Sequence, residues 1–126
     1  LEVLLLTGSK ATDEGMKGVA CLSRLESLSL DRTTVTDKGL KELATLNQLH
    51  SLYLNETKVT DKGLKDLATL RQLRLLYLSH TPVTDVGLKE LPSFSRLTFV
   101  GLRSTKVTDV GIAELRKSAP KLHIER

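Results

Sequence analysis

The chain has 126 residues, which fits one domain; 40 % of them are hydrophobic, only 3 % are aromatic, and tryptophan is absent. A hydrophobic core must therefore be built mainly from leucine. The formal net charge is +4, and acidic residues are scattered among the basic ones, which excludes the dense basic stripe of a dedicated nucleic-acid binder.

The single cysteine, Cys21, cannot form a disulfide within the chain. Extracellular domains of this size often carry disulfides, so the composition favours a reducing, cytoplasmic compartment, although the sequence alone does not fix the localisation. No apolar run approaches the length of a membrane span, and we expect no membrane contact.

The first ten residues, Leu1–Lys10, follow a strand pattern that is already under way at Leu1, without the charged and apolar regions of a signal peptide. We therefore interpret the chain as a fragment that further repeats or another domain would precede. In this interpretation Leu1, Leu4 and Leu6 expose an apolar floor beside an unpaired strand edge, and this uncapped edge could drive dimerisation.

A Thr-Asp-x-Gly phrase first appears at residues 12–15 and recurs every 24 residues, at 36–39, 60–63, 84–87 and 108–111. The period predicts four full repeats, Ala11–Thr34, Val35–Lys58, Val59–Pro82 and Val83–Lys106, after the partial repeat Leu1–Lys10. A repeat this short cannot bury its leucines alone, so we expect stacking into a single domain over residues 1–126.

Each repeat combines a helical and a strand pattern. After Asp37, leucines recur at helical spacing, and Asp37 itself is expected to be the helix N-cap. Gly39 is a poor helix former, so its recurrence predicts a neighbour too close for a Cβ. The alternating leucines of Ser51–Leu54 predict a short strand, and the hydroxyl of Thr57 is expected to satisfy a backbone group where the chain leaves the sheet.

The strand half of the repeat carries a known template, Leu25-x-x-Leu28-x-Leu30-x-x-Thr33-x-Val35, with further copies starting at Leu49, Leu73 and Leu97. Over essentially its whole length the chain resembles the leucine-rich-repeat superfamily. Its Thr-Asp-x-Gly-Leu phrase is similar to the cysteine-containing, F-box-associated, RNI-like repeats and to the 24-residue repeats of planctomycete-type bacterial proteins. It departs from the F-box class by a shorter repeat and by Thr where that class prefers Cys.

The resemblance implies an α/β fold, a right-handed leucine-rich-repeat solenoid with a parallel β-sheet on the concave face and helices on the convex face. Strands pair at about 4.8 Å whereas helices pack at about 8–10 Å, so such a stack must bend toward its strands. At the carboxyl end Pro120 and Lys121 interrupt the pattern and polar residues follow, so residues 107–126 are expected to form a capping repeat.

The strand residues that point away from the core form columns across the predicted sheet. One column contains Val3, Ser27, Ser51, Leu75, Phe99 and His123, and the next contains Leu5, Ser29, Tyr53, Tyr77, Gly101 and Glu125. Both tyrosines and one of two phenylalanines thus lie on the concave face of a chain poor in aromatics. Solenoids generally bind through this face, so we predict a protein or peptide ligand there.

The predicted partner-binding residues are an amphipathic patch of Tyr53, Tyr77, Leu75 and Phe99 and a polar rim of Asp31, Asn55, Arg103, Arg32, Glu56 and His80. The two central repeats differ from each other mainly in the strand and its exit loop, which favours recognition, although neutral drift would give the same pattern. The tyrosines could equally stabilise the sheet as cross-strand pairs, and both interpretations can hold together.

The sequence predicts no enzyme activity, cofactor or metal. One cysteine and three dispersed histidines give no zinc spacing, Gly-rich phosphate loops are absent, and each Thr-Asp-x-Gly phrase offers one carboxylate where calcium needs several. An Arg32–Glu56–His80 run is interpreted as a charge-complementary ladder. No nucleic acid is expected, because acidic residues lie among the helical lysines.

Several functional settings remain open besides a protein-binding module of a bacterial protein. They are the substrate-recognition domain of an F-box-type ubiquitin ligase, a regulatory domain of a larger bacterial enzyme, and an engineered or purely structural scaffold. The irregular Pro92-Ser93-Phe94 segment argues against an idealised design.

Overall fold

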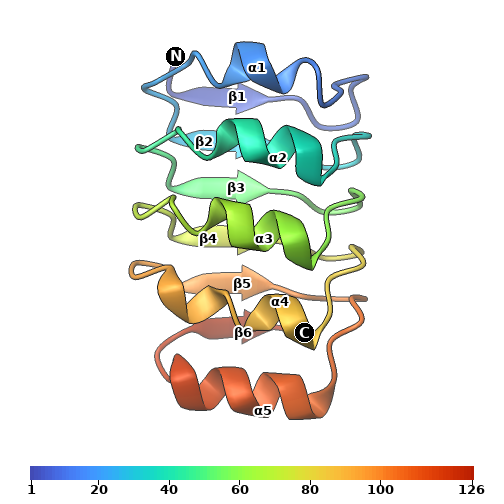
Figure 1. Cartoon of the computed structure of the whole chain (residues 1–126), viewed down its shortest axis with the longest axis vertical. Helices are drawn as coiled ribbons and strands as arrows, with labels where there is room; N and C mark the ends of the chain where they lie inside the picture. The colour runs from blue at the N-terminus through green and yellow to red at the C-terminus, as the bar shows by residue number, and fades with distance from the viewer.

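Short strands alternate with helices along the whole chain, residues 1–126, in the computed structural model (Figure 1). The strands are β1 (Val3–Leu5), β2 (Ser27–Ser29), β3 (Ser51–Tyr53), β4 (Leu75–Tyr77), β5 (Phe99–Gly101) and β6 (His123–Glu125). The helices are α1 (Met16–Val19), α2 (Asp37–Leu43), α3 (Asp61–Leu67), α4 (Asp85–Leu88) and α5 (Asp109–Ser118), with a short 3-10 helix, η1 (Leu91–Ser93), after α4.

The six strands form one open parallel sheet in the order of the sequence, from β1 to β6. Each strand residue lies beside the residue one repeat later, as Ser51 beside Leu75 and Tyr53 beside Tyr77. The columns predicted from the period are therefore confirmed.

The helices all cover the same face of the sheet, and they fan out over a greater length than the strands behind them (Figure 1). Helices need more room than paired strands, so the stack curves with the sheet on its concave side. The predicted solenoid architecture is confirmed. None of the helices has the length and apolar content needed to cross a membrane.

The core lies between the sheet and the helices and consists almost entirely of leucine. Leu28, Leu52 and Leu76 enter it from the strands, and Leu40 and Leu64 enter it from the helices. All five side chains are fully inaccessible to solvent. Burying one such side chain stabilises a fold by about 1.5–3 kcal/mol, so the repeated leucines supply most of the driving force for stacking.

The threonines that follow the strands form the predicted hydroxyl ladder. The Thr57 hydroxyl donates a hydrogen bond to the Leu54 carbonyl oxygen at 2.7 Å, and this contact recurs at the same phase of the other repeats. The threonine thus satisfies a carbonyl at the point where the chain leaves the sheet.

The recurring aspartates do not cap their own helices, so the prediction for Asp37 is wrong. The N-cap of α2 is Thr36, whose hydroxyl accepts a hydrogen bond from the Lys38 N–H. Asp37 is the first helical residue, and its carboxylate instead accepts two hydrogen bonds from Thr60 of the next repeat, from the N–H at 2.8 Å and the hydroxyl at 2.5 Å.

We call this pair of hydrogen bonds the aspartate bridge. It also joins Asp13 to Thr36, Asp61 to Thr84 and Asp85 to Thr108. An aspartate just before a helical stripe fits either the N-cap or the first helical position, and the preceding threonine takes the N-cap here.

The prediction that Gly39 meets a close neighbour is confirmed. A Cβ on Gly39 would lie 2.5 Å from Oδ1 of Asp13 and 3.0 Å from Cγ of Met16. Gly63, Gly87 and Gly111 meet the preceding aspartate in the same way. The glycine therefore provides the space in which the aspartate bridge of the preceding repeat lies.

The two ends of the stack differ. At the amino end Leu1, Val3 and Leu5 are 66 %, 53 % and 69 % exposed, and β1 has a strand neighbour on one side only. At the carboxyl end the side chain of Arg126 forms an ion pair with Asp109, the one aspartate at the start of helices α2–α5 that has no threonine in a following repeat.

Candidate functional site

Four neighbouring rings form a row across the concave face. The ring centroids of Tyr53 and Tyr77 lie 4.6 Å apart with an interplanar angle of 12°, and those of Tyr77 and Phe99 lie 4.9 Å apart at 39°. Phe99 and His123 continue the row at 5.5 Å and 21°. We call these four residues the aromatic row, which spans β3 to β6.

The aromatic row passes from the column of Tyr53 and Tyr77 to the column of Phe99 and His123. It changes column beside Gly101. Tyr77 is paired with Gly101, and Phe99 is paired with Leu75 in the neighbouring column. A Cβ on Gly101 would lie 3.5 Å from Cδ1 of Tyr77 and 3.6 Å from Cε1 of Phe99. The missing side chain thus leaves the space in which the two rings approach each other.

Sequence reasoning missed His123 as a site residue. The signal was available, because His123 shares its column with Phe99 and the two are direct partners in the register of β5 and β6. It was not used because a histidine at the polar carboxyl end fits a capping role equally well.

The predicted apolar patch is gathered in one place. Tyr53, Tyr77, Phe99 and Leu75 are all half-buried on the concave face, so none of them belongs to the core. Burial, the neighbouring Tyr53 and the charge of Glu125 raise the pKa of the Tyr77 hydroxyl, so this hydroxyl keeps its proton and its hydrogen-bond donor.

Two residues of the predicted polar rim join neighbouring strands. Asp31 accepts hydrogen bonds from the Asn55 N–H at 2.7 Å and from its Nδ2 at 3.3 Å. Oδ1 of Asn55 accepts a bond from the Ser79 N–H at 2.8 Å, and Oγ of Ser79 accepts one from the Arg103 N–H at 3.2 Å. Asp31 and Asn55 are therefore largely engaged, whereas the Arg103 side chain is exposed.

The other rim residues lie in the turn after the strand. Arg32, Glu56 and His80 are exposed and adopt left-handed backbone conformations, with φ of 55°, 56° and 58°. No ion pair joins them, so the predicted charge-complementary ladder is not formed. Its members are instead exposed to solvent in the turn.

The carboxylates of the recurring aspartates have a structural role. Desolvation raises the pKa of Asp13, but hydrogen bonds from the Thr36 hydroxyl and from two backbone N–H groups outweigh it and lower the pKa overall. The hydroxyl and N–H of Thr108 lower the pKa of Asp85. No group of three or more His, Cys, Asp or Glu residues is placed to hold a metal ion.

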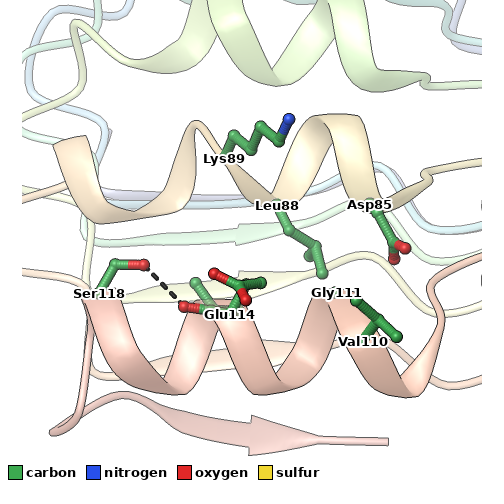
Figure 2. Close-up of a pocket in the computed structure, with 8 residues that line it drawn as sticks. Asp85, Leu88, Lys89, Val110, Gly111, Glu114 and Ser118 are labelled. Atoms are coloured by element: carbon green, nitrogen blue, oxygen red, sulfur yellow. Dashed lines mark hydrogen bonds between the residues drawn. The ribbon is translucent and has the colours of Figure 1, made fainter.

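A groove of about 270 Å³ lies on the helical face, between α4 and α5 (Figure 2). It exists because the chain leaves α4 after Leu88 and enters η1 at Leu91, whereas α5 continues to Ser118. Figure 2 shows Leu88 directed toward α5 and Lys89 directed away from it. The groove is below the usual size of a ligand pocket, and none of the predicted site residues lines it.

The comparisons with known proteins agree with this architecture. A family model described as Leucine Rich repeat matches residues 23–44, 46–68 and 69–91, which together make up more than half of the chain. None of the curated proteins matches the chain.

Among solved structures, the chain is similar to internalin C2 from Listeria monocytogenes str. 4b F2365, with 30 % identity and a TM-score of 0.70 over 86 % of this chain and 44 % of that one. An internalin (inlF) from the same strain is 22 % identical, with a TM-score of 0.55 over 100 % of this chain and 50 % of that one. The tropomodulin C-terminal domain of Caenorhabditis elegans is 14 % identical, with a TM-score of 0.75 over 96 % and 83 %. The last two show the fold alone, and the chain spans half or less of each internalin.

Proposed function

Because the chain belongs to the leucine-rich repeat family, we propose that it is a protein-binding module that captures a protein or peptide partner on its concave sheet face. It performs no catalysis of its own. The observation that carries this proposal is the aromatic row, which gathers both tyrosines and one of the two phenylalanines of the protein on the one face that the helices leave uncovered.

The aromatic row suits protein recognition for two reasons. Aromatic side chains are enriched among the residues that carry most of the binding energy in interfaces. The rings of Tyr53, Tyr77 and Phe99 already pack against one another, so a partner that contacts their edges has few rotamers left to immobilise. Leu75 extends the apolar surface beside Phe99.

The polar residues around the row support a partner with mixed charge. Arg103 is free to pair with an acidic group, and Arg32, Glu56 and His80 surround the exit side of the sheet with both signs of charge. We assign Asp31 and Asn55 a supporting role, because their hydrogen bonds hold adjacent strands together. The helical lysines lie among acidic residues, so the partner is a protein rather than a nucleic acid.

The same binding surface would serve two kinds of larger protein. The chain would be the substrate-recognition domain of an F-box-type ubiquitin ligase or a regulatory domain of a larger bacterial enzyme. The similarity to a Listeria internalin at 30 % identity supports a bacterial setting. In each case the concave face binds the partner, and the domain attached to the chain determines what the binding does.

The test is to select peptides from a displayed random library on the immobilised chain and to measure their Kd for three variants. Tyr77→Ser and Phe99→Ser alter the aromatic row, and serine already occupies both columns at β2. Lys41→Ser, on the helical face, is the matched control. We expect at least a tenfold weaker Kd for the first two variants and no change for the control.

Two measurements make the result decisive. Thermal unfolding of each variant shows whether weaker binding reflects lost contacts or lost structure. Amide chemical shifts of the peptide complex locate the contact surface. Peptides that bind the Tyr77→Ser and Phe99→Ser variants unchanged, or that shift helical amides only, would refute the proposal.

A further inference from the structure

The residues that border the aromatic row on the entrance side of the strands change charge along the stack. The positions just before β2, β3 and β4 hold Glu26, His50 and Arg74, and all three side chains lie outside the core. The His50 N–H donates to the Glu26 carbonyl oxygen at 2.7 Å, and the Arg74 N–H donates to the His50 carbonyl oxygen at 2.8 Å, so the three residues stay in register. This entrance column therefore begins with a carboxylate and reaches a guanidinium two strands later.

The residues on the exit side of the strands change charge in the same direction. The exit column consists of the residues two positions after the strands, Asp31, Asn55, Ser79 and Arg103. The hydrogen bonds described above join each of them to the next. The column begins with the carboxylate of Asp31 beside β2 and ends with the exposed guanidinium of Arg103 beside β5. Both borders of the aromatic row are thus acidic toward β2 and basic toward β4 and β5.

Other charged residues near the sheet do not reverse this polarity. Arg32 lies in the turn after β2 and Glu125 lies on β6, so the strands and turns keep two carboxylates against one guanidinium at the β2 end and two guanidiniums against one carboxylate at the other end. Arg24 and Arg96 lie at the same phase of two repeats and put the same charge at both ends. No ion pair within the protein uses a side chain of either column, so these charges are available to a partner.

The aromatic row offers a further contact for a cation at its β2 end. Tyr53 is paired with Ser29 on β2 and stacks on Tyr77 on its other side, so one face of its ring has no aromatic neighbour. A cationic side chain is attracted to the face of an aromatic ring as well as to carboxylates. At the other end the Tyr77 hydroxyl, whose raised pKa leaves it protonated, offers a hydrogen bond to an anion.

We infer, on the basis of the proposed function of the concave face, that the partner is a peptide segment with the opposite charge polarity. The segment crosses the strands along the aromatic row and carries a basic side chain over β2 and an acidic side chain over β4 and β5. Its basic side chain meets the Tyr53 ring and the carboxylates of Glu26 and Asp31. Its acidic side chain meets Arg74 and Arg103.

The geometry of the sheet sets the spacing of the two charges in the partner. Parallel strands lie about 4.8 Å apart, so charges two or three strands apart are separated by about 10–14 Å. An extended peptide advances by about 3.3 Å per residue, which places its basic and acidic residues about three to five positions apart. A uniformly basic or uniformly acidic segment would meet like charge at one end of the row, which disfavours it.

The test selects peptides from a displayed random library on the immobilised chain and on two charge-reversed variants, Glu26→Lys and Arg74→Glu. Peptides selected on the original chain should be enriched in one basic and one acidic residue about three to five positions apart. Selection on Glu26→Lys should favour acidic residues at both positions, and selection on Arg74→Glu should favour basic ones. Glu42→Lys and Lys41→Glu, the matched controls, make the same charge changes on α2 and should select the same pattern as the original chain.

Charge reversal in both partners then shows which end of the sheet each charge contacts. Replacing the basic residue of a selected peptide by glutamate should weaken its Kd for the original chain by about tenfold, since like charges then face each other at β2. The Glu26→Lys variant should restore the Kd of this peptide to within about threefold. Arg74→Glu should not restore it, and Arg103→Glu tests the same end of the sheet from the exit column. Circular dichroism checks that each variant keeps the fold.

The results separate this inference from the proposed function. Peptides that bind Tyr77→Ser more weakly but show no charge pair, or that bind Glu26→Lys and Arg74→Glu as tightly as the original chain, would overturn the inference alone. Peptides whose Kd is insensitive to Tyr77→Ser would overturn the proposed function and this inference with it.

Discussion

The carboxylate of Asp37 holds Thr60, a residue 23 positions later, by its N–H and its hydroxyl at once. Both hydrogen bonds have a charged acceptor, the kind that contributes most to stability. The junction between two repeats is therefore fixed at the beginning of the helix as well as by the sheet and the leucine core.

Asp37→Ala should destabilise the protein by about 2–3 kcal/mol, because it removes two hydrogen bonds to a charged acceptor and leaves the Thr60 N–H without a partner. Asp109→Ala is the matched control, since Asp109 contacts only Arg126 at the surface and should cost at most about 0.5 kcal/mol. Urea unfolding followed by circular dichroism measures both. Equal losses would show that the bridge contributes nothing specific.

Gly63→Ala should destabilise the protein by about 1–3 kcal/mol through overpacking. The added Cβ would lie 3.0 Å from Cδ1 of Leu40, 3.2 Å from Cγ of Asp37 and still closer to its Oδ1. Gly18→Ala meets nothing within 4 Å inside α1 and should be neutral or stabilising by up to about 1 kcal/mol. The comparison uses the same denaturation assay, and a Gly63→Ala variant as stable as Gly18→Ala would contradict the packing argument.

Acid should weaken the aspartate bridges. The folded protein holds the pKa of Asp13 and of Asp85 below the usual value, so the unfolded chain takes up protons at these groups first as the pH falls. Their contribution is fully present above the unfolded pKa of about 3.9 and is lost as the pH falls through the lower folded pKa. The stability difference between the original chain and Asp85→Asn should therefore shrink from pH 7 to pH 3, and a difference independent of pH would contradict the assignment.

Glu56→Gly should be more stable than Glu56→Ala by about 1 kcal/mol. Both substitutions remove the same charge, but alanine keeps the cost of a left-handed backbone at φ 56°, which glycine avoids. The first repeat already carries a glycine with φ 67° at this phase, Gly8. The measurement is the urea midpoint of the two variants, and the reverse order would show that the turn relaxes when its side chain is shortened.

The period made most of the fold predictable. A motif that recurs at constant spacing fixes the register of every strand pair, and the alternation of leucines fixes which side chains enter the core. The positions of Tyr53 and Tyr77 on the opposite face followed directly from these two patterns. The role of Asp37 did not follow, because a helix-starting aspartate bonds to its own helix or to the next repeat with the same local sequence. The joint recurrence of Asp37 and Gly39 was the signal that could have separated the two.

The candidate site was less predictable than the scaffold. Column position tells which face a side chain occupies, but it does not reveal that Asp31 bonds to Asn55 across the strands. It also does not reveal that Phe99 turns over Gly101 to reach Tyr77, since that contact depends on a side-chain rotamer and on the absence of a neighbour. Which residues bind a partner stays a prediction.

The aspartate bridge has a direction, because each aspartate bonds to a threonine that comes later in the chain. Protein synthesis proceeds in the same direction, amino end first. When Thr60 leaves the ribosome, the carboxylate that receives it has already been made, and no bridge requires a residue still to be translated. The order in which the junctions can close therefore matches the order in which the ribosome delivers them.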